Sequence, residues 1–375
     1  MLFDPYSIRD LDLPNRIVVS PMCQYSAVDG CPTDWHIVHW GQMLQSGAAM
    51  FIIEATGVEP EGRITHGCVG LYDDTTEQAL TVKLAQARAQ AGGKTIVAMQ
   101  LGHAGRKASS QLPWEGGQSI PVEQGGWITS APSAIPHAEG EPAPVALDTA
   151  GLARVKQAFV QAAQRAGRAG IDALELHFAH GYLMHQFLSP IANQRTDDYG
   201  GSFENRIRYP LEVFEAVRAA WPESKPLGVR VSATDWLGED DATSWTSAQT
   251  VELARRLDAL GCDWIDVSSG GVSPKQQIKL APGYQVPFAQ AVKEATDMAT
   301  FAVGLITDPK QADDIVVRGQ ADFVALARAM LYDPRWPWHA AAELGGKVSG
   351  PVQYMRSLPR EAAGIFTTTK VIGSR

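Results

Sequence analysis

The residues of this chain with the clearest chemical potential are two histidines and a tyrosine in the run His177-Phe-Ala-His180-Gly-Tyr182. Two imidazoles three residues apart, where a strand leads into a loop, can both face one pocket and donate hydrogen bonds to a single oxygen. Such a pair polarises a carbonyl group or binds a phenolate. The Tyr182 phenol can act as a general acid if it reaches the atom to be protonated. A tyrosine that only packs at a helix start fits this pattern about as well.

A metal site is the main alternative for this segment. His177, His180 and His185 place three imidazoles within nine residues. A catalytic zinc site also needs an open water position and carboxylates that orient the ligands, and neither is evident nearby. We therefore expect no bound metal. Histidines that are merely satisfied in a core are a weak explanation, because several polar residues gather at this one strand end.

A glycine in one apolar segment and an arginine at the end of the next indicate a phosphate site. Gly304 lies near the end of one apolar segment, and Arg328 ends the next one along the chain. Glycine allows close approach of the backbone, and arginine offers a planar fork to phosphate oxygens. In barrels of parallel strands, the loops after strands seven and eight often bind phosphate through backbone N–H groups.

Gln100 and Arg230 are suited to the polar edge of a flavin ring. A side-chain amide and a cation can bond the pyrimidine edge, and the cation favours the negative charge that develops there on reduction. Arg230 could instead form an ion pair inside a barrel. That alternative needs an acidic partner, which the sequence does not identify.

Cys23 follows another apolar segment and has three possible roles. It could be a nucleophile, a buried small hydrophobe, or a group that tunes an adjacent cofactor. A Cys/His hydrolase also needs an oxyanion hole and an oriented base, which we cannot assign, so the nucleophile is the least favoured role. Glu54 ends the second apolar segment, and Ala55 beside it could approach a ring face closely.

Eight short apolar segments position these residues, and helix-patterned sequence separates most of them. This alternation predicts a (β/α)8 TIM barrel, whose active site lies at the carboxyl ends of the strands. The expected strands are Arg16–Met22, Ala49–Thr56, Thr95–Leu101, Ala173–Phe178, Leu227–Ser232, Trp264–Ser269, Phe301–Ile306 and Phe323–Arg328. The small or polar residues at their ends are Cys23, Glu54, Gln100, His177, His180, Arg230, Ser268, Gly304 and Arg328. Together these residues indicate a flavin site.

The chain reads as a single domain over residues 1–375. Phe3 to Pro14 could form a hairpin across the barrel floor. Residues 105–148 are rich in Pro and Gly, so most of this segment should be neither helix nor central strand, and we expect an insertion that caps the pocket. A helix from Leu152 to Ala169 should follow, with Asp148 as its N-cap. The C-terminal extension, residues 346–375, leaves the barrel, and we expect loose order from Thr367 to Arg375.

Bulk properties fit a cytoplasmic enzyme. Of 375 residues, 45% are hydrophobic and 19% charged, and the net charge of −9 argues against binding to nucleic acid or an anionic membrane. No secretory leader is visible between Met1 and Asp12, and no apolar run approaches the ~20 residues that span a bilayer. The four cysteines match no zinc or iron–sulfur spacing, so we expect reduced thiols; they are Cys23, Cys31, Cys68 and Cys262.

From Leu2 to about Arg356 the chain resembles the Old Yellow Enzyme family of FMN-dependent ene reductases. It is most similar to the thermophilic-like branch that includes YqjM and xenobiotic reductase A. The matching motifs are Ser20-Pro-Met-Cys-Gln-Tyr25, Glu54-Ala-Thr56 with Pro60-Glu-Gly-Arg63, Gln100-Leu-Gly-His-Ala-Gly-Arg-Lys107, His177-Phe-Ala-His-Gly-Tyr-Leu183, Asn193-Gln-Arg-Thr-Asp-Asp-Tyr-Gly-Gly-Ser202 with Glu204-Asn-Arg206, Val303-Gly-Leu-Ile306 and Pro351-Val-Gln-Tyr354. Several such motifs in the same order make a chance match very improbable.

The resemblance implies non-covalent FMN at the top of the barrel. It implies that the isoalloxazine is held by Ser20, Pro21, Met22, Cys23, Ala55, Gln100, His177 and Arg230. It implies that the phosphate is held by Gly304, Leu305, Ala327 and Arg328. Ala327 departs from the family, which more often has Gly before the phosphate arginine. The methyl group leaves the backbone N–H free but tightens the fit.

The resemblance also implies an activity. NADPH, or sometimes NADH, would reduce the flavin and leave, and an activated alkene such as an enone would then take its place. His177 and His180 would bind the carbonyl oxygen, flavin N5 would deliver hydride to Cβ, and Tyr182 would protonate Cα. Cys23 would tune the flavin. The further substrate contacts are Tyr25, Lys107 and, from the neighbouring subunit of a dimer or tetramer, Arg356.

Two other functions remain as alternatives. A Schiff-base or metal-dependent lyase on the same fold would need Lys107 or Lys275 as its amine, and neither ends a barrel strand. A flavin-binding sensor without catalysis would have no need for Tyr182 beside two histidines. A yellow protein that loses its colour with NADPH in the absence of air would separate most of these functions.

Overall fold

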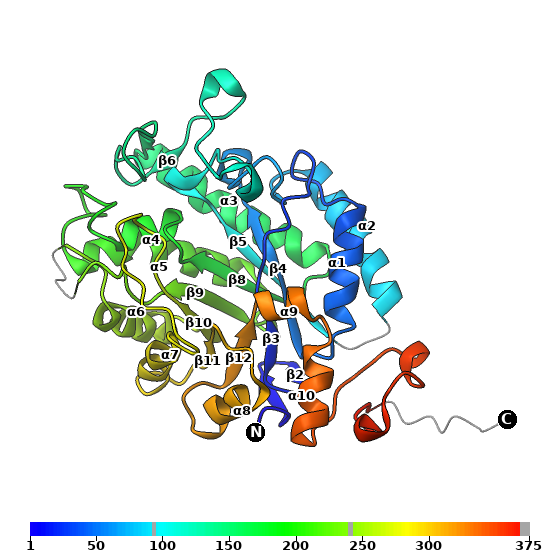
Figure 1. Cartoon of the computed structure of the whole chain (residues 1–375). Helices are drawn as coiled ribbons and strands as arrows, with labels where there is room; N and C mark the ends of the chain where they lie inside the picture. Colours follow the sequence, from blue (N-terminus) through cyan, green and yellow to red (C-terminus); the bar gives the residue numbers. More distant parts are fainter. Residues whose placement is uncertain (92–94, 239–242, 368–375) are drawn as a thin grey trace.

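The computed structural model describes residues 1–91, 95–238 and 243–367. Within them, eight parallel strands close into a barrel in sequence order, the eighth pairing with the first (Figure 1). The barrel strands are β3 (Ile17–Val19), β4 (Met50–Gly57), β5 (Ile96–Gly102), β8 (Ala173–Phe178), β9 (Leu227–Ser232), β10 (Trp264–Ser268), β11 (Ala299–Ala302) and β12 (Phe323–Leu326). The predicted (β/α)8 barrel is confirmed.

Helices surround the barrel and cover the outer face of its strands (Figure 1). Strands β8, β9 and β10 are therefore buried at every position, which is why they read as continuous apolar runs. The helices are α1 (Asp34–Leu44), α2 (Asp74–Ala91), α3 (Thr149–Arg168), α4 (Leu183–Leu188), α5 (Phe203–Ala220), α6 (Ser247–Ala259), α7 (Val286–Lys293), α8 (Pro309–Val317), α9 (Arg328–Tyr332) and α10 (Trp336–Leu344), with a 3-10 turn, η1 (Pro60–Gly62), after β4.

Three strand ends differ from the sequence prediction by two residues or more. β3 ends at Val19 instead of Met22, and β11 ends at Ala302, four residues before Ile306. The β11 chain turns at Gly304, whose φ of +126° is incompatible with a strand, although the apolar pattern continues through this point. β12 ends at Leu326, and Arg328 instead opens α9.

A hairpin closes the floor of the barrel, as predicted. β1 (Tyr6–Ile8) pairs antiparallel with β2 (Leu11–Leu13). Ile8 and Leu13 join a buried cluster that includes the first residues of five barrel strands, which are Met50, Ala173, Trp264, Ala299 and Phe323. The site must therefore lie at the opposite end, where the strands finish.

Between β5 and α3 lies the predicted insertion, which Figure 1 shows at the end of the barrel opposite the hairpin. It consists of short pieces rather than long helices: η2 (Gly105–Lys107), η3 (Pro113–Glu115), η4 (Val122–Gln124) and the paired strands β6 (Ser130–Ala131) and β7 (Val145–Ala146). The next helix, α3, is capped by Asp148 as predicted, because its Oδ1 accepts a hydrogen bond from the Gly151 N–H.

The C-terminal extension lies beside α10 in Figure 1 and includes η5 (Val352–Tyr354) and η6 (Arg360–Ala362). Ile365 and Phe366 pack with Trp338 of α10 in a small buried cluster. The loose order expected from Thr367 to Arg375 falls almost wholly outside the described residues, which end at Thr367. No helix in the described ranges is both long enough and apolar enough to cross a membrane.

Candidate active site

The carboxyl end of β8 brings His177, His180 and Tyr182 together. The ring centroid of His177 lies 5.1 Å from that of His180 and 5.0 Å from that of Tyr182, both edge to face. His177 is buried, whereas His180 and Tyr182 are half-buried. The three groups singled out by spacing thus form one cluster.

The hydrogen bonds of His177 fix which nitrogen can donate. The Ala179 N–H donates to His177 Nδ1 at 3.3 Å, so the proton of the neutral ring is on Nε2. Burial and the nearby Arg230 guanidinium hold the pKa of His177 well below 6.5. Burial and the same guanidinium also lower the pKa of His180, whose Nε2 lies 2.8 Å from Ser268 Oγ. Both rings are neutral at neutral pH, and His177 offers an N–H donor to a ligand.

Tyr182 retains its proton in this environment. Loss of water contact raises the pKa of the phenol well above 10, and Cys23 and Tyr25 raise it further. The ammonium of Lys107 lies 5.0 Å from the ring centroid. Tyr182 is therefore a protonated phenol beside two neutral imidazoles, which is a suitable state for a general acid.

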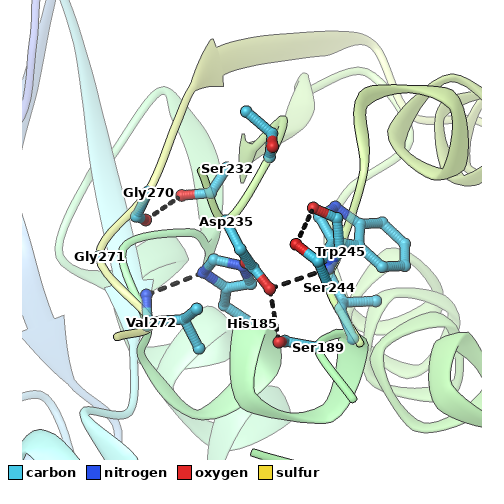
Figure 2. A network of polar contacts seen from close by, with 12 residues as sticks. His185, Ser189, Ser232, Asp235, Ser244, Trp245, Gly270, Gly271 and Val272 are labelled. Atoms are coloured by element: carbon cyan, nitrogen blue, oxygen red, sulfur yellow. Dashed lines mark hydrogen bonds and ion pairs between the residues drawn. The ribbon is translucent and has the colours of Figure 1, made fainter. Parts of the chain in front are cut away.

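A buried network under this cluster holds the loop that carries it (Figure 2). The Gly181 N–H donates to His185 Nδ1 at 2.9 Å, and His185 Nε2 bonds Asp235 Oδ1 at 2.9 Å. Asp235 also accepts from Ser189 Oγ at 2.6 Å and from the Trp245 N–H at 2.9 Å. Both nitrogens of His185 are engaged, so this ring does not face the site. In the described ranges no cluster of three His, Cys, Asp or Glu residues could hold a metal ion.

The backbone of this loop is strained and tightly fitted. His180 has a φ of +59°, which is uncommon for a residue with a Cβ. Its N–H donates to Ser232 Oγ at 2.9 Å, and Ser232 Oγ donates to the Gly270 carbonyl at 2.8 Å. Gly181 leaves no room for a side chain, because a Cβ there would lie 2.1 Å from the Gly271 oxygen. Such strain persists only where surrounding bonds fix the conformation.

Lys107 ties the insertion to the same loop. Its ammonium donates to the carbonyl oxygens of His180 at 2.8 Å and Gly271 at 2.9 Å. Loss of water contact and the adjacent Arg106 lower the pKa of Lys107 to about 8. Lys107, one of the two amines that a Schiff-base lyase could use, is thus committed to two carbonyl groups.

Gln100 and Arg230 each lie beside an acidic residue inside the barrel. Arg230 Nε is 3.2 Å from Asp266 Oδ2, which identifies the acidic partner that the sequence alone did not reveal. Gln100 Nε2 donates to Glu175 Oε1 at 2.8 Å. The register explains this, because Arg230 pairs with Asp266 and Gln100 with Glu175 on adjacent strands.

The ends of β11 and β12 border a cavity of about 180 Å³. Its lining residues include the predicted Gly304, Leu305, Ala327 and Arg328, together with Ser268, Tyr284, Gln285 and Thr307. Gly304 is tightly enclosed, because a Cβ there would lie 2.8 Å from Gln285 Nε2. Tyr284 and Gln285 were missed by sequence reasoning, since they precede α7 and no strand pattern marks them.

A pair of thiols joins the segments that follow β3 and β4. Cys23 and Cys68 are hydrogen-bonded to each other, which raises the pKa of Cys23 well above 9 and lowers that of Cys68 to about 7. Cys23 is therefore a protonated thiol and a poor nucleophile. Glu54 accepts from the Gln24 N–H at 3.1 Å, and burial raises its pKa well above 4.5. Both groups are neutral where the sequence predicts a cofactor.

The arrangement fits FMN. Ser20 Oγ is buried and has no hydrogen-bond partner within the described part of the chain, so it is poised for a ligand. Pro21 and Met22 follow it and are half-buried. Ala55 borders a narrow gap together with His177 and Tyr182. A phosphate-sized cavity with an arginine completes the set at the other end.

Arg356 is not part of this cluster. It is exposed on the C-terminal extension, which packs beside α10. Tyr25 does border the site side of the insertion, because it lines a cavity of about 360 Å³ with Lys107 and residues of the insertion. The structure therefore brings together the predicted site residues from the strand ends, and leaves Arg356 elsewhere.

Comparisons with known proteins identify the family of this chain. Residues 1–345 match the family described as NADH:flavin oxidoreductase / NADH oxidase. An NADH:flavin oxidoreductase of Gibberella zeae is 44% identical over 362 residues, which cover 92% of this chain and 86% of that protein. The NADPH dehydrogenase of Geobacillus thermodenitrificans is 42% identical over 358 residues, or 95% and 98% of the two chains. Morphinone reductase is similar in structure, with a TM-score of 0.74 and 28% identity, covering 99% and 94%.

Proposed function

The chain belongs to the NADH:flavin oxidoreductase / NADH oxidase family, within the YqjM-like branch of the Old Yellow Enzymes, and we propose that this NAD(P)H-dependent FMN oxidoreductase reduces the C=C bond of activated alkenes such as enones and enals. The observation that carries the proposal is the cluster of two neutral imidazoles and one protonated phenol. These groups can bind a carbonyl oxygen and protonate a carbon of the same substrate.

When bound, FMN supplies the hydride chemistry between a nicotinamide and an electrophilic carbon. His177 and His180 bind the carbonyl oxygen of the alkene and stabilise the negative charge that develops on it. Tyr182 gives its proton to Cα. Tyr25 and Lys107 border the substrate, and Cys23 tunes the cofactor.

We place the cofactor across the strand ends. Arg230 and Gln100 hold the polar edge of the ring, and Ser20, Pro21, Met22 and Ala55 line its other contacts. Gly304, Leu305, Ala327 and Arg328 hold the phosphate. A solved complex of morphinone reductase with tetrahydroNAD supports entry of a nicotinamide into this site. We also place Arg356 in the neighbouring subunit's site of a homo-oligomer. Its side chain is exposed, and the C-terminal extension that carries it lies outside the cluster at the strand ends of its own chain.

The test separates the two half-reactions by anaerobic stopped-flow spectroscopy. In Tyr182→Phe, reduction of FMN by NADPH should stay nearly unchanged, because it needs no proton from this residue. Oxidation by an enone should slow by about 10²–10⁴-fold, the usual cost of losing a general acid. Equal slowing of both halves would make Tyr182 a positioning residue. No oxidation of wild-type flavin by any enone would refute the proposed function.

A further inference from the structure

Two carboxyl groups lie inside the barrel next to the proposed flavin-edge residues. Glu175 on β8 and Asp266 on β10 have no exposed surface, and Arg230 on β9 lies on the strand between them. His177, Arg230 and Asp266 form one layer of facing residues across three strands. Glu175 is two residues before His177, so it faces the barrel interior one layer deeper.

Glu175 is bound by neutral donors. Gln100 Nε2 donates to its Oε1 at 2.8 Å, and Trp264 Nε1 donates to its Oε2 at 3.3 Å. The indole reaches Glu175 across Gly228, where a Cβ would lie 2.1 Å from the Trp264 ring. Glu175 therefore fixes the position of the Gln100 amide nitrogen.

The single cation of this cluster is paired with the other carboxyl. Arg230 Nε lies 3.2 Å from Asp266 Oδ2. A second buried carboxylate would have no cation of its own, and such a charge is costly to keep. Burial and the negative charge of Asp266 raise the pKa of Glu175 to about 8, as expected for a buried carboxyl group without a cation of its own. His177, the other titratable group of the layer, is neutral.

We propose that Glu175 and Asp266 are positioning residues that set the charge beside the flavin: Asp266 compensates Arg230, and Glu175 stays protonated at neutral pH while it orients Gln100. This inference rests on the proposed placement of the flavin edge over Gln100 and Arg230. Reduction of the flavin adds negative charge nearby, which opposes ionisation of Glu175. Above about pH 8, reduction should therefore draw one extra proton to this carboxyl.

The first experiment measures the midpoint potential of bound FMN against pH by spectroelectrochemistry. The wild-type line should steepen above about pH 8. Glu175→Gln, which keeps an acceptor for Gln100, should stay straight and coincide with wild type at pH 7. A straight wild-type line overturns the proposal and needs no variant. A second result also overturns the proposal: at pH 7, Glu175→Gln prefers reduced over oxidised FMN about tenfold more than wild type does, which is about 30 mV for a two-electron couple. Such a rise would mean that Glu175 is ionised in the wild-type protein.

The second experiment removes the counter-charge of Arg230. In the Glu175→Gln background, where no second carboxyl group can ionise in its place, Asp266→Asn should raise the ratio of affinities for reduced over oxidised FMN by about tenfold at pH 7, or about 30 mV. Asp263→Asn in the same background is the matched control, since Asp263 precedes the same strand at the barrel floor, where it binds Arg9 and Arg218. An unchanged potential on adding Asp266→Asn to Glu175→Gln contradicts the inference. If wild type binds no FMN, or Arg230→Lys leaves FMN affinity and potential untouched, the proposed flavin placement fails instead.

Discussion

Neutral imidazoles at the strand end can favour an electron-rich oxygen through hydrogen bonds without carrying a positive charge themselves. His177 Nε2 donates because its Nδ1 accepts from the Ala179 N–H. A phenolate such as that of 4-hydroxybenzaldehyde should therefore bind over oxidised FMN and give a long-wavelength charge-transfer band. His177→Ala should weaken this binding and lower turnover by roughly 10²-fold or more, the scale of losing one oxyanion donor. Titration of the band measures the change.

The same site predicts a pH response. The pKa values of His177 and His180 are lowered, so neither ring gains a proton as the pH falls from 7.5 through 6.5. Phenolate affinity, corrected for ionisation of the phenol itself, should stay level across this range. His339→Ala is the control, because His339 is exposed on α10. Binding that strengthens with a titration near pH 6.5 would show a charged imidazole and contradict the neutral pair.

Cys23 is a further residue whose chemical state decides its role. Its thiol is protonated beside Cys68, so nucleophilic catalysis is disfavoured. Cys23→Ser should retain FMN and alkene reduction while shifting the midpoint potential of the flavin. Spectroelectrochemistry and steady-state rates measure both properties. Loss of all activity with FMN still bound would instead support covalent catalysis.

Sequence reasoning at this scale succeeded where partners are local. His177, His180 and Tyr182 lie within six residues, so their spacing alone predicts that they meet. Asp266 and Cys68 are distant in sequence from the residues they bind. The barrel register brings Asp266 beside Arg230, and the segments that follow β3 and β4 bring Cys23 and Cys68 together. Charge compensation and thiol pairing were therefore invisible before the fold was known.

At the scale of elements, the β8–α4 loop depends on two backbones in close contact. A Cβ at Gly181 would lie 2.1 Å from the Gly271 oxygen, and its φ is +74°. Gly181→Ala should displace His180 and Tyr182, so phenolate affinity and the enone half-reaction should both fall by at least tenfold while FMN stays bound. Gly201→Ala is a matched control with a φ of +82° and open space around it. Equal losses in both variants would assign the effect to backbone strain alone.

Elements with strong periodicity were predicted best. The helix after the insertion, α3, begins beside Asp148 and ends at Arg168, one residue before the predicted end. The ends of β11 and β12 were wrong, because Val303 and Ile306 are buried without being in a strand. Hydrophobic pattern reports burial, and near an active site buried residues also line turns. The errors at β11 and β12 thus fall where the backbone bends around the proposed phosphate site, whereas the error at β3 falls at the segment that begins with Ser20.

At the scale of the whole molecule, the proposed flavin site gathers residues from most of the barrel strands. A ligand that bridges many strands should stabilise the entire barrel, and we expect the single-domain chain to unfold in one main transition. FMN at 100 times its dissociation constant should add about 2.7 kcal/mol to the free energy of unfolding. Differential scanning fluorimetry at increasing FMN concentrations measures this stabilisation. Two transitions, of which FMN shifts only one, would contradict a single domain.

The phosphate end of the proposed site allows a specific control for this stabilisation by bound FMN. Arg328 lines the cavity beside Gly304, and a charge-assisted hydrogen bond to phosphate contributes about 1.5–3 kcal/mol. Arg328→Ala should therefore weaken FMN binding by about 10- to 100-fold and lower the thermal stabilisation at a fixed FMN concentration. Riboflavin, which lacks the phosphate, should bind wild type and variant alike. Equal losses for FMN and riboflavin would mean that Arg328 supports the fold of the pocket, and the phosphate would then have to bind elsewhere on the barrel rim.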